Sequence, residues 1–441
     1  MTLSPGQSID QAVQTTLTLL HDLFSSAALP NFSVRLWDGT TWQSHPETDE
    51  PPHFTLVLKH PGALRKMFLP PSELNLGEAY IYDDFDIEGD ILAIFAFGDY
   101  VMDEHWGKRA QLRYGKLLLS LPKTGQPRPR NVAAQLHGPR HSKERDRQAV
   151  TFHYDRSNEF YALWLDRRMV YSCAYFANPT DELDVAQERK LDYICRKLRL
   201  QPGERLLDIG CGWGGLVLYA AQHYGVEAYG ITLSQAQAEL AQQRIQEAGM
   251  ADHCRVEVRD YRDLNDGDSF EKIVSVGMFE HVGEELLPTY FQRAWHLLRP
   301  GGVFLNHGIA SILTHPPQPE SAFNQRYVFP DGALVPISTT VRIAESSGFE
   351  VRDVESLREH YALTLRHWVR RLEEHADEAR QLTSEVTYRI WRLYMSASIH
   401  AFQMGRVNIY QTLLAKPDHG KSYLPLTRAD WYAATSEGQL R

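Results

Sequence analysis

A glycine cluster after a buried apolar run is the feature of this sequence that most clearly indicates chemistry. The run 206–209 leads into Gly210, Gly212 and Gly214, and a helix-forming stretch follows at 216–222. Glycines at such a turn let the backbone bend sharply and let a ligand approach it closely. Glycine-rich turns without a ligand share this pattern, so the neighbouring residues must decide between the two readings.

The position of the nearest acidic residue separates two cofactor classes. Asp208 stands before the glycines, whereas a dinucleotide-binding loop has its ribose-binding acid about 20 residues after them. At that later position the chain has 229–234, which contains no acid. The loop therefore resembles the S-adenosylmethionine (SAM) loop of class I methyltransferases more than an NAD loop.

Two further polar residues follow strands that we expect to be neighbours. Glu280 comes shortly after the expected strand 272–277, and His307 ends the expected strand 302–307. Because ligands in an open α/β sheet bind beyond the carboxyl ends of the strands, both side chains should reach the crevice of the glycine loop. Alone, Glu280 could cap a helix and His307 could be a core histidine, but their joint position favours a functional role.

The elements that position these residues alternate between strands and helices. Such alternation predicts a mostly parallel α/β sheet with helices on both faces. Residues 363–414 have a helical period, and we expect them to pack as helices over this domain. The expected strands are 205–209, 226–232, 254–260, 272–277 and 302–307.

The first 123 residues predict a smaller α+β domain. Ser8 is expected to cap an amphipathic helix, and 32–37 and 54–58 read as neighbouring strands. This part of the chain has no cluster of histidine, cysteine or paired acids that suggests catalysis. Residues 124–148, rich in proline, glycine and bases, are expected to link it to a catalytic domain at 149–441.

The charge of the chain is uneven. Its length of 441 residues suggests more than one domain, and a formal charge of −10 argues against nucleic acid as a partner. Residues 108–147 nevertheless contain eleven lysines and arginines and two acids. This basic stretch is a candidate contact for an anionic lipid surface, and a solvated linker is an equal alternative.

The remaining composition excludes several classes of protein. The first residues show no secretory signal, and the longest apolar run, 91–97, is too short to cross a bilayer. The cysteines form no CxxC pair, so neither a disulfide framework nor a metal site is expected. These features predict a cytoplasmic protein. The cysteines are Cys173, Cys195, Cys211 and Cys254.

Five motifs in one order resemble the cyclopropane fatty acid synthase family, which includes the mycolic acid cyclopropane synthases. They are YSCAYF at 171–176, LDIGCGWGG at 207–215, ITLS at 231–234, GMFEHVG at 277–283 and HYALTLRHW at 360–368. The resemblance is dense over 151–430 and looser in the smaller domain, which is similar to a lipid-binding extension. It implies a Rossmann-like class I SAM-dependent methyltransferase fold and a cyclopropane-fatty-acyl-phospholipid synthase at the inner face of the membrane.

The resemblance also implies a reaction and its catalytic residues. A cis double bond of a phospholipid acyl chain attacks the SAM methyl group, and the resulting carbocation loses a proton as the ring closes. Family members use bound bicarbonate as the base. The matching residues are Cys173, Glu280, His307 and Tyr361, with the backbone of Ile309.

The same resemblance implies a set of SAM contacts, in which Gln237 replaces the usual ribose-binding acid. Gly210, Gly212 and Gly214 should approach the methionine portion, with Asp208 organising the loop. The remaining expected contacts are Tyr154, Tyr171, Ser172, Thr232, Leu233, Gln237, Asp260 and Tyr261. Tyr154, Tyr171 and Leu233 could equally be packing residues.

Two alternatives stay open. A family member could instead make a methylene, methyl-branched or oxygenated lipid, although the complete set of base-site side chains favours ring closure. A lipid-carrying module with a vestigial cofactor site is disfavoured because the glycine loop is intact. A homodimer is a further expectation from the resemblance.

Overall fold

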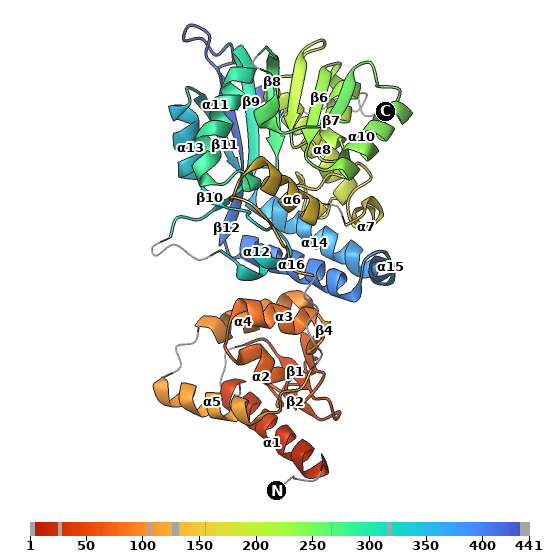
Figure 1. Ribbon diagram of the computed structural model, residues 1–441, viewed down its shortest axis with the longest axis vertical. Helices are drawn as coiled ribbons and strands as arrows, with labels where there is room; N and C mark the ends of the chain where they lie inside the picture. The colour runs from red at the N-terminus through yellow and green to blue at the C-terminus, as the bar shows by residue number, and fades with distance from the viewer. Residues whose placement is uncertain are drawn as a thin grey trace. The chain divides into compact units, whose positions relative to one another are not determined.

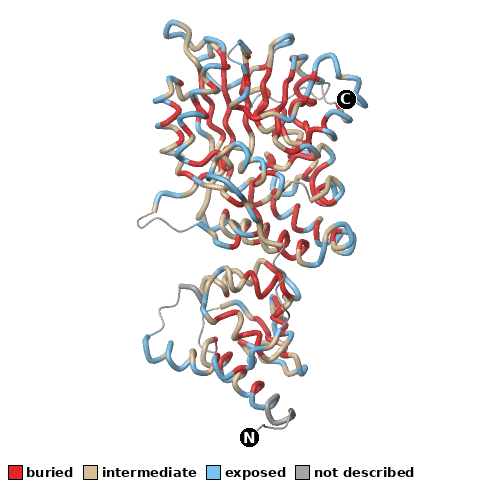
Figure 2. Tube along the Cα trace, viewed as in Figure 1, coloured by how far each residue is buried: buried red, intermediate tan, exposed pale blue. Residues whose placement is uncertain are grey.

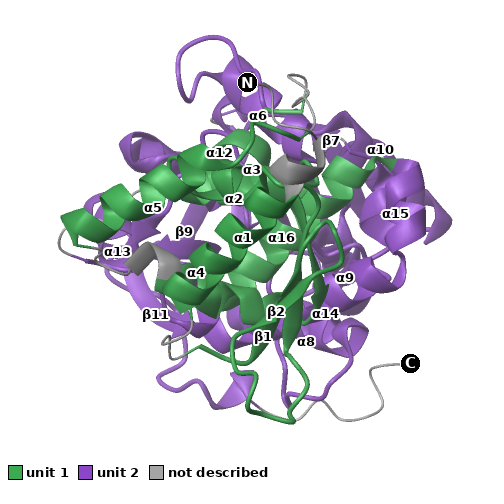
Figure 3. Ribbon diagram, turned by 90° about the horizontal axis from the view of Figure 1, so that it is seen from below, with its two compact units in different colours: residues 1–133, 321–328, 383–400 green, residues 134–320, 329–382, 401–441 purple. Residues whose placement is uncertain are grey.

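The computed structural model describes residues 5–24, 29–103, 107–125, 132–154, 156–265, 267–314 and 320–432. The chain divides into two compact units (Figure 3). Unit 1 comprises Met1–Ala133, Ser321–Val328 and Thr383–His400, and unit 2 comprises Ala134–Glu320, Phe329–Leu382 and Ala401–Arg441. Segments from late in the chain thus complete unit 1. That residues 124–148 link two domains stays a prediction.

Unit 2 is built on one mixed sheet in which β5 to β9 run parallel and β12 runs antiparallel to both β9 and β11 (Figure 1). The order is β11-β12-β9-β8-β5-β6-β7, and β10 adds to β9. The predicted mostly parallel α/β sheet is confirmed. The strands are β5 (Arg205–Ile209), β6 (Glu227–Thr232), β7 (Cys254–Val258), β8 (Phe270–Val276), β9 (Leu298–Ser311), β10 (Val335–Pro336), β11 (Glu350–Ser356) and β12 (Val407–Ala415).

The connections between these strands are mostly helical. They include short 3-10 turns at η2 (Tyr261–Asp263), η3 (Phe279–His281) and η4 (Glu284–Leu286). The helices are α6 (Lys143–Tyr154), α7 (Asn158–Ala162), α8 (Leu183–Leu198), α9 (Gly215–Tyr224), α10 (Gln235–Glu247), α11 (Leu287–Leu297), α13 (Ile337–Ser346), α14 (Arg358–Glu374), α15 (Ala376–Leu382) and α16 (Glu385–Gln403). Among the described residues, no helix is long and apolar enough to cross a membrane.

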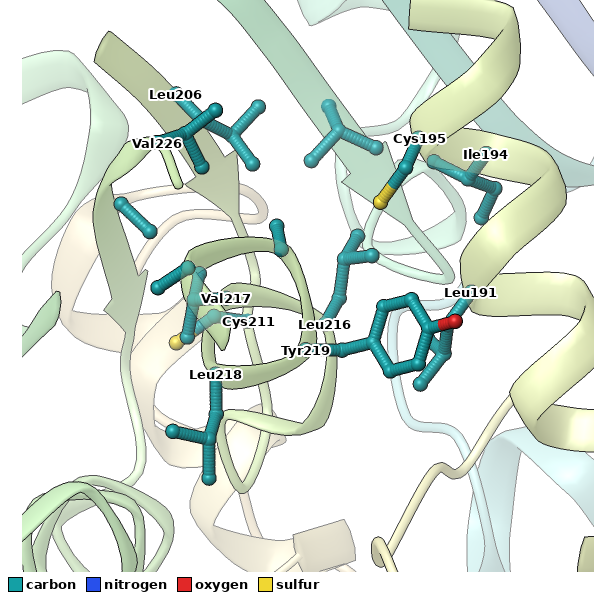
Figure 4. Close-up of a cluster of buried hydrophobic side chains, with 14 of the residues drawn as sticks. Leu191, Ile194, Cys195, Leu206, Cys211, Leu216, Val217, Leu218, Tyr219 and Val226 are labelled. Atoms are coloured by element: carbon teal, nitrogen blue, oxygen red, sulfur yellow. The ribbon is translucent and has the colours of Figure 1, made fainter. Parts of the chain in front are cut away.

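Alternate residues of β5 face two separate hydrophobic clusters, because successive side chains of a strand point to opposite faces of the sheet. Leu206 joins Leu191 and Val217 in the cluster beneath α8 and α9 (Figure 4). Leu207 and Ile209 join the other cluster, which includes residues of α11. The central strands are therefore buried on both sides (Figure 2). This burial holds the carboxyl end of β5, and with it the glycine loop, in a fixed position.

Three local predictions were wrong. The expected helical run 363–414 ends in a strand, because residues 407–415 fill the place between β9 and β11. The last part of the expected linker, 143–148, is the start of a helix, α6 (Lys143–Tyr154). The first helix, α1 (Pro5–Phe24), already begins before Ser8, so Ser8 is not its cap.

Unit 1 contains a four-stranded sheet in the order β2-β1-β3-β4. The predicted neighbours β1 and β3 pair in parallel, and Phe32 and Phe54 stack across them with ring centroids 5.3 Å apart. Arg389 of α16 completes this unit by donating to the Tyr80 carbonyl at 2.9 Å. The elements are β1 (Phe32–Arg35), β2 (Thr41–Gln43), β3 (Phe54–Leu58), β4 (Phe85–Gly89), α2 (Ala63–Phe68), α3 (Glu73–Ile81), α4 (Ile94–Asp103), α5 (Lys108–Ser120) and α12 (Ala322–Tyr327).

Candidate functional site

The glycine loop between β5 and α9 needs its glycines for steric reasons. Gly210 has a φ of 86°, and a Cβ there would lie 2.6 Å from Met278 Cβ. Gly212 and Gly214 also have positive φ values, and Gly214 caps α9. The backbone N–H groups of Gly210 and Cys211 both donate to the Ile231 carbonyl at 2.9 Å. The loop is therefore a tight turn fastened to the neighbouring strand β6.

A pocket opens beside this loop at the carboxyl ends of β5, β6 and β8. Almost all of the predicted SAM contacts line it; Gly214, at the start of α9, does not. The predicted residues in its wall are Tyr154, Tyr171, Ser172, Asp208, Gly210, Gly212, Thr232, Leu233, Gln237, Asp260 and Tyr261. The structure thus brings together residues from 154 to 261 around one cavity.

Sequence reasoning missed several residues that also line the pocket. His281 lies within the GMFEHVG motif beside Glu280, so its motif was the available signal. Lys190 comes from the middle of α8, and Asp146 comes from α6. Asp146 carried no signal because it lies in the stretch that we read as a linker, and Lys190 belongs to no motif of the sequence. Met278 and Arg262 also line the pocket and were not predicted.

Hydrogen bonds within the pocket wall fix two of the predicted contacts. Thr232 Oγ1 donates to Gln237 Oε1 at 2.7 Å, and both side chains are buried. Asp260 accepts from Arg262 Nε at 2.8 Å, and Arg262 Nη2 also reaches Asp146 Oδ2 at 2.9 Å. Arg262 therefore connects the end of β7 to α6. This connection holds α6 as one wall of the pocket.

Asp208 lies at the base of the pocket and is almost fully buried. Burial raises its pKa to about 7, and the nearby Lys190 charge opposes this rise. Asp208 Oδ1 has no hydrogen-bond partner among the described residues. A buried carboxyl oxygen without a partner is costly, so the structure supplies an acceptor for a donor group of a ligand or a water molecule. The pocket fits SAM in this respect.

A second set of polar residues, which includes the predicted base-site residues Glu280 and His307, lies beside β9. Phe279 packs against Gly308, which places the neighbouring Glu280 next to the strand. Glu280 Oε1 accepts the Ile309 N–H at 2.6 Å. His307 lies two residues earlier on β9 and is 1% exposed, with its Nδ1 3.4 Å from Gln411 Nε2. Glu280, His307 and Ile309 are thus brought together.

Cys173 and Tyr361 both donate to the Leu357 carbonyl. Cys173 Sγ donates weakly to the Leu357 carbonyl at 3.8 Å, and the Tyr361 N–H donates to the same oxygen at 3.1 Å. The Leu357 N–H in turn donates to the Ile409 carbonyl at 2.9 Å, and Ile409 is paired with Ile309 across β12 and β9. Leu357 thus lies between β12 and both Cys173 and Tyr361, and none of the five predicted base-site residues lines the pocket wall described above.

The protonation states at this second group follow from burial. Burial raises the pKa of Glu280 to about 7, opposed by the Ile309 N–H. Burial lowers the pKa of His307 well below its ordinary value, aided by the charges of Lys190 and Lys197. Burial also raises the pKa of the Cys173 thiol. The group therefore holds a neutral imidazole, a neutral thiol and a carboxyl that can exchange a proton near neutral pH.

Glu280 Oε2 and His307 Nε2 are buried and have no hydrogen-bond partner among the described residues. Glu280 Oε2 can accept a hydrogen bond when the carboxyl is ionised or donate one when it is protonated. His307 Nε2 can donate a hydrogen bond as the N–H of a neutral imidazole. A small oxyanion with one hydrogen, such as bicarbonate, would satisfy both. The residues present therefore fit this anion.

Comparison with known proteins places the chain among lipid-modifying methyltransferases. A family model described as mycolic acid cyclopropane synthetase matches residues 141–412, and a domain of unknown function (DUF7884) matches residues 19–98. A probable fatty acid methyltransferase from Pseudomonas putida is 40% identical over 94% of this chain and all of its own length. The Escherichia coli K12 cyclopropane-fatty-acyl-phospholipid synthase is 36% identical over 72% of this chain and 82% of its own.

Solved structures agree with the observed fold. The cyclopropane synthase MmaA2 from Mycobacterium tuberculosis matches with a TM-score of 0.59 at 34% identity, covering 61% of this chain and 97% of that one. The mycolic acid cyclopropane synthase CmaA1, complexed with S-adenosylhomocysteine (SAH) and CTAB, matches with a TM-score of 0.58, also at 34% identity and over the same shares of both chains. The predicted class I SAM-dependent methyltransferase fold is confirmed.

Proposed function

The chain belongs to the mycolic acid cyclopropane synthetase family of SAM-dependent methyltransferases, and from this premise we propose that it is a cyclopropane-fatty-acyl-phospholipid synthase. It transfers the methyl carbon of SAM to a cis double bond of a phospholipid acyl chain. The observation that carries the proposal is that the buried Glu280 and His307 each present a polar atom with no hydrogen-bond partner among the described residues. Such a site is needed to remove the proton that ring closure releases.

The first step is attack of the double bond on the methyl carbon, which breaks the bond from that carbon to sulfur and leaves a carbocation on the acyl chain. An alkene is a weak nucleophile, so the protein must align it with the methyl group and exclude water. Four aromatic rings form a row suited to both tasks, with consecutive centroids 6.0, 5.1 and 5.9 Å apart. They are Tyr154, Tyr171, Trp368 and Tyr361. Their faces can also attract a cation.

The second step is loss of a proton from the transferred carbon as the ring closes. Bicarbonate, when bound, supplies the base. Glu280 Oε2 and His307 Nε2 would hold it, and Glu280, whose pKa is raised to about 7, would receive the proton. The neutral Cys173 thiol and Tyr361 would complete its surroundings.

The proposed partner is an anionic phospholipid surface, contacted peripherally. The second half of the basic stretch is largely committed to ion pairs, since Arg145 and Arg140 pair with Asp331 and Lys143 pairs with Asp263. Arg128 and Arg130 lie outside the described residues. The first half is α5, whose residues include four bases and no acid.

One face of α5 combines charge with exposed apolar surface. Lys108, Leu112, Lys116 and Leu119 share this face by helical spacing, and the two leucines are 67% and 56% exposed. A basic face with exposed leucines is typical of helices that lie in a membrane interface. We therefore place the proposed membrane contact on this face of α5. A homodimer stays an expectation.

A second candidate product is a methylene or methyl-branched fatty acyl chain. It is favoured by the relatives named as fatty acid methyltransferases, among them the tuberculostearic acid methyltransferase UfaA1 of Mycobacterium tuberculosis at 34% identity over 73% of this chain. The complete base site supports the ring instead. Both products require the same SAM pocket and the same acyl substrate.

The test is incubation of the purified protein with SAM and vesicles of unsaturated phospholipid, followed by mass spectrometry of the acyl chains. A ring and a methylene product share a mass, but mild hydrogenation reduces only the methylene. A product that has the mass of the ring and resists hydrogenation supports the proposal, whereas a saturated methyl-branched or oxygenated product differs from the ring in mass. A product that takes up hydrogen assigns the second candidate, and no lipid product contradicts both.

A further inference from the structure

Lys190 is a buried lysine that the proposed mechanism does not yet use. It lies in the middle of α8, is 1% exposed, and donates from Nζ to Ser172 Oγ at 2.8 Å. Burying an ammonium group in a protein interior is costly unless an opposite charge compensates it. Asp166 and Asp208 compensate part of this cost, and the hydrogen bond to Ser172 fixes the ammonium group next to Cys173.

The surroundings of Lys190 connect the two parts of the site. Lys190 and Asp208 line the same pocket beside the glycine loop. Its hydrogen-bond partner Ser172 precedes Cys173, which belongs to the proposed base site. The charge of Lys190 also acts on Cys173 and on His307, so it reaches two of the side chains proposed to hold the anion.

The proposed base site has an electrostatic difficulty. Glu280 is its one carboxyl, and an ionised Glu280 beside a bound anion would place two negative charges together in a buried space. Like charges at such short range strongly oppose each other in a low-dielectric interior. A nearby buried cation would offset this repulsion. Lys190 contacts Ser172, the residue before Cys173, and its charge acts on both Cys173 and His307.

We propose that Lys190 is a positioning residue that supplies the counter-charge for the anion bound between Glu280 and His307. This inference rests on the proposed use of bicarbonate as the base. Lys190 acts through the field of its ammonium group and through Ser172, which it holds at 2.8 Å. It need not contact the substrate.

A neighbouring residue of α8 provides a matched control. Gln187 is fully buried and donates from Nε2 to the Ser172 carbonyl at 2.9 Å and to the Val170 carbonyl at 3.2 Å. It holds the same segment as Lys190 but carries no charge. Gln187→Met therefore removes anchoring alone, whereas Lys190→Met removes both anchoring and charge, and Lys190→Arg keeps the charge.

The experiment measures binding of ¹³C-labelled bicarbonate by NMR line broadening to the full chain saturated with SAH. Lys190→Met should weaken bicarbonate binding at least about tenfold, as expected for losing one nearby buried charge. Lys190→Arg should restore most of this affinity, and Gln187→Met should change it less than about threefold. Equal losses in Lys190→Met and Gln187→Met, or unchanged affinity in Lys190→Met, would overturn the proposal. Circular dichroism confirms that each variant is folded.

The pH dependence of binding gives a second readout that anchoring would not affect. Burial lowers the pKa of Lys190 to about 8, although Asp166, Cys173 and Asp208 oppose this change. Between pH 7.5 and about 9, Asp208 and Glu280 stay largely ionised, while the Cys173 thiol and His307 stay neutral. Completion of Glu280 ionisation should lower bicarbonate affinity slightly in both proteins, and the natural protein should show a further, larger fall as pH rises through about 8 that Lys190→Met lacks. A fall of equal size in both proteins would contradict the counter-charge role.

The lipid assay distinguishes failure of the proposed function from failure of the proposed role of Lys190. If the natural protein forms no lipid product, the proposed function fails whatever Lys190 does. If it forms product and binds bicarbonate with no dependence on Lys190, the inference fails and the proposed function stands. If it forms product but binds no bicarbonate, the anion and its counter-charge fail together.

Discussion

At the scale of single residues, different residues are proposed to serve SAM binding and proton transfer. Asp208 sits at the pocket that fits SAM, and Glu280 lies beside β9, where its carboxyl accepts the Ile309 N–H. Both carboxyls have a pKa raised to about 7 by burial. A carboxyl with a pKa near neutrality can take up and release a proton under working conditions, which suits Glu280 to its proposed role.

Glu280→Gln should lose most activity, whereas Cys173→Ser should retain a substantial part. The glutamine keeps an oxygen for the Ile309 N–H but cannot accept the proton. The serine hydroxyl can replace the hydrogen bond of a thiol that is neutral and not a nucleophile. The rate of SAM-dependent lipid modification measures both. The reverse order of activities would refute these assignments.

The pH dependence of stability offers an independent check on Glu280. Because the folded protein holds its carboxyl proton more tightly than the unfolded chain does, Glu280 reduces stability as pH rises from its ordinary pKa through about 7. Glu280→Gln should therefore have a free energy of unfolding about 3 kcal/mol higher than that of the natural protein at pH 8, and near pH 4 the difference should vanish. Calorimetry at both pH values tests this. An equal difference at both would show that ionisation is not the cause.

At the scale of elements, the site depends on where strands end and how the adjoining turns are built. The alternation of strands and helices and the glycine loop were predictable, because periodicity and glycine spacing are local properties of the sequence. The strand β12 was not predictable, since its residues adopt a strand only through pairing with β9 and β11. The same limit explains α6 and Lys190, which reach the pocket through tertiary packing.

Gly210→Ala and Gly212→Ala form a matched pair in the glycine loop. Both need a positive φ, which costs an alanine about 1–2 kcal/mol. Only the Gly210 variant adds a clash, since its Cβ would lie 2.6 Å from Met278 Cβ, whereas nothing lies within 4 Å at Gly212. Titration calorimetry with SAH should show a larger loss of affinity for Gly210→Ala. A larger loss for Gly212→Ala would indicate that ligand contact, not loop geometry, dominates there.

Arg262→Gln should weaken SAM binding by loosening α6. The guanidinium joins Asp260 to Asp146, and both acids line the pocket. Lys143→Gln is the control, because it breaks an ion pair of α6 whose side chains are about half exposed and whose contribution is below about 1 kcal/mol. The KM for SAM should rise in Arg262→Gln, with little change in Lys143→Gln. Equal KM values in both variants would show that α6 does not depend on this connection.

At the scale of the whole molecule, a chain with a formal charge of −10 is proposed to bind an anionic surface. Local concentration of bases resolves this conflict, because exposed charges interact mainly within a Debye length of about 8 Å at physiological salt. The basic stretch was visible in the sequence. Its division into a free face on α5 and a paired second half required the structure, since the paired acids Asp331 and Asp263 are distant in sequence.

Lys108→Gln/Lys116→Gln should weaken binding to vesicles that contain anionic phospholipid. Two exposed bases contribute about 2 kcal/mol together, or about thirtyfold in affinity, and less as salt is raised. The control Arg342→Gln/Lys421→Gln removes two other exposed bases and should bind normally. Vesicle sedimentation measures both. Equal binding by the two variants, or binding that is insensitive to salt, would place the contact elsewhere.

The most direct test of the central claim is the fate of the hydrogens on the transferred carbon. The protein is incubated with SAM deuterated at its methyl group and with vesicles of unsaturated phospholipid, and the acyl product is analysed by mass spectrometry. Ring closure by deprotonation predicts a product that retains two of the three deuterium atoms and resists mild hydrogenation. A product that retains all three deuterium atoms would show that the carbocation is not deprotonated at the transferred carbon, and would contradict the account.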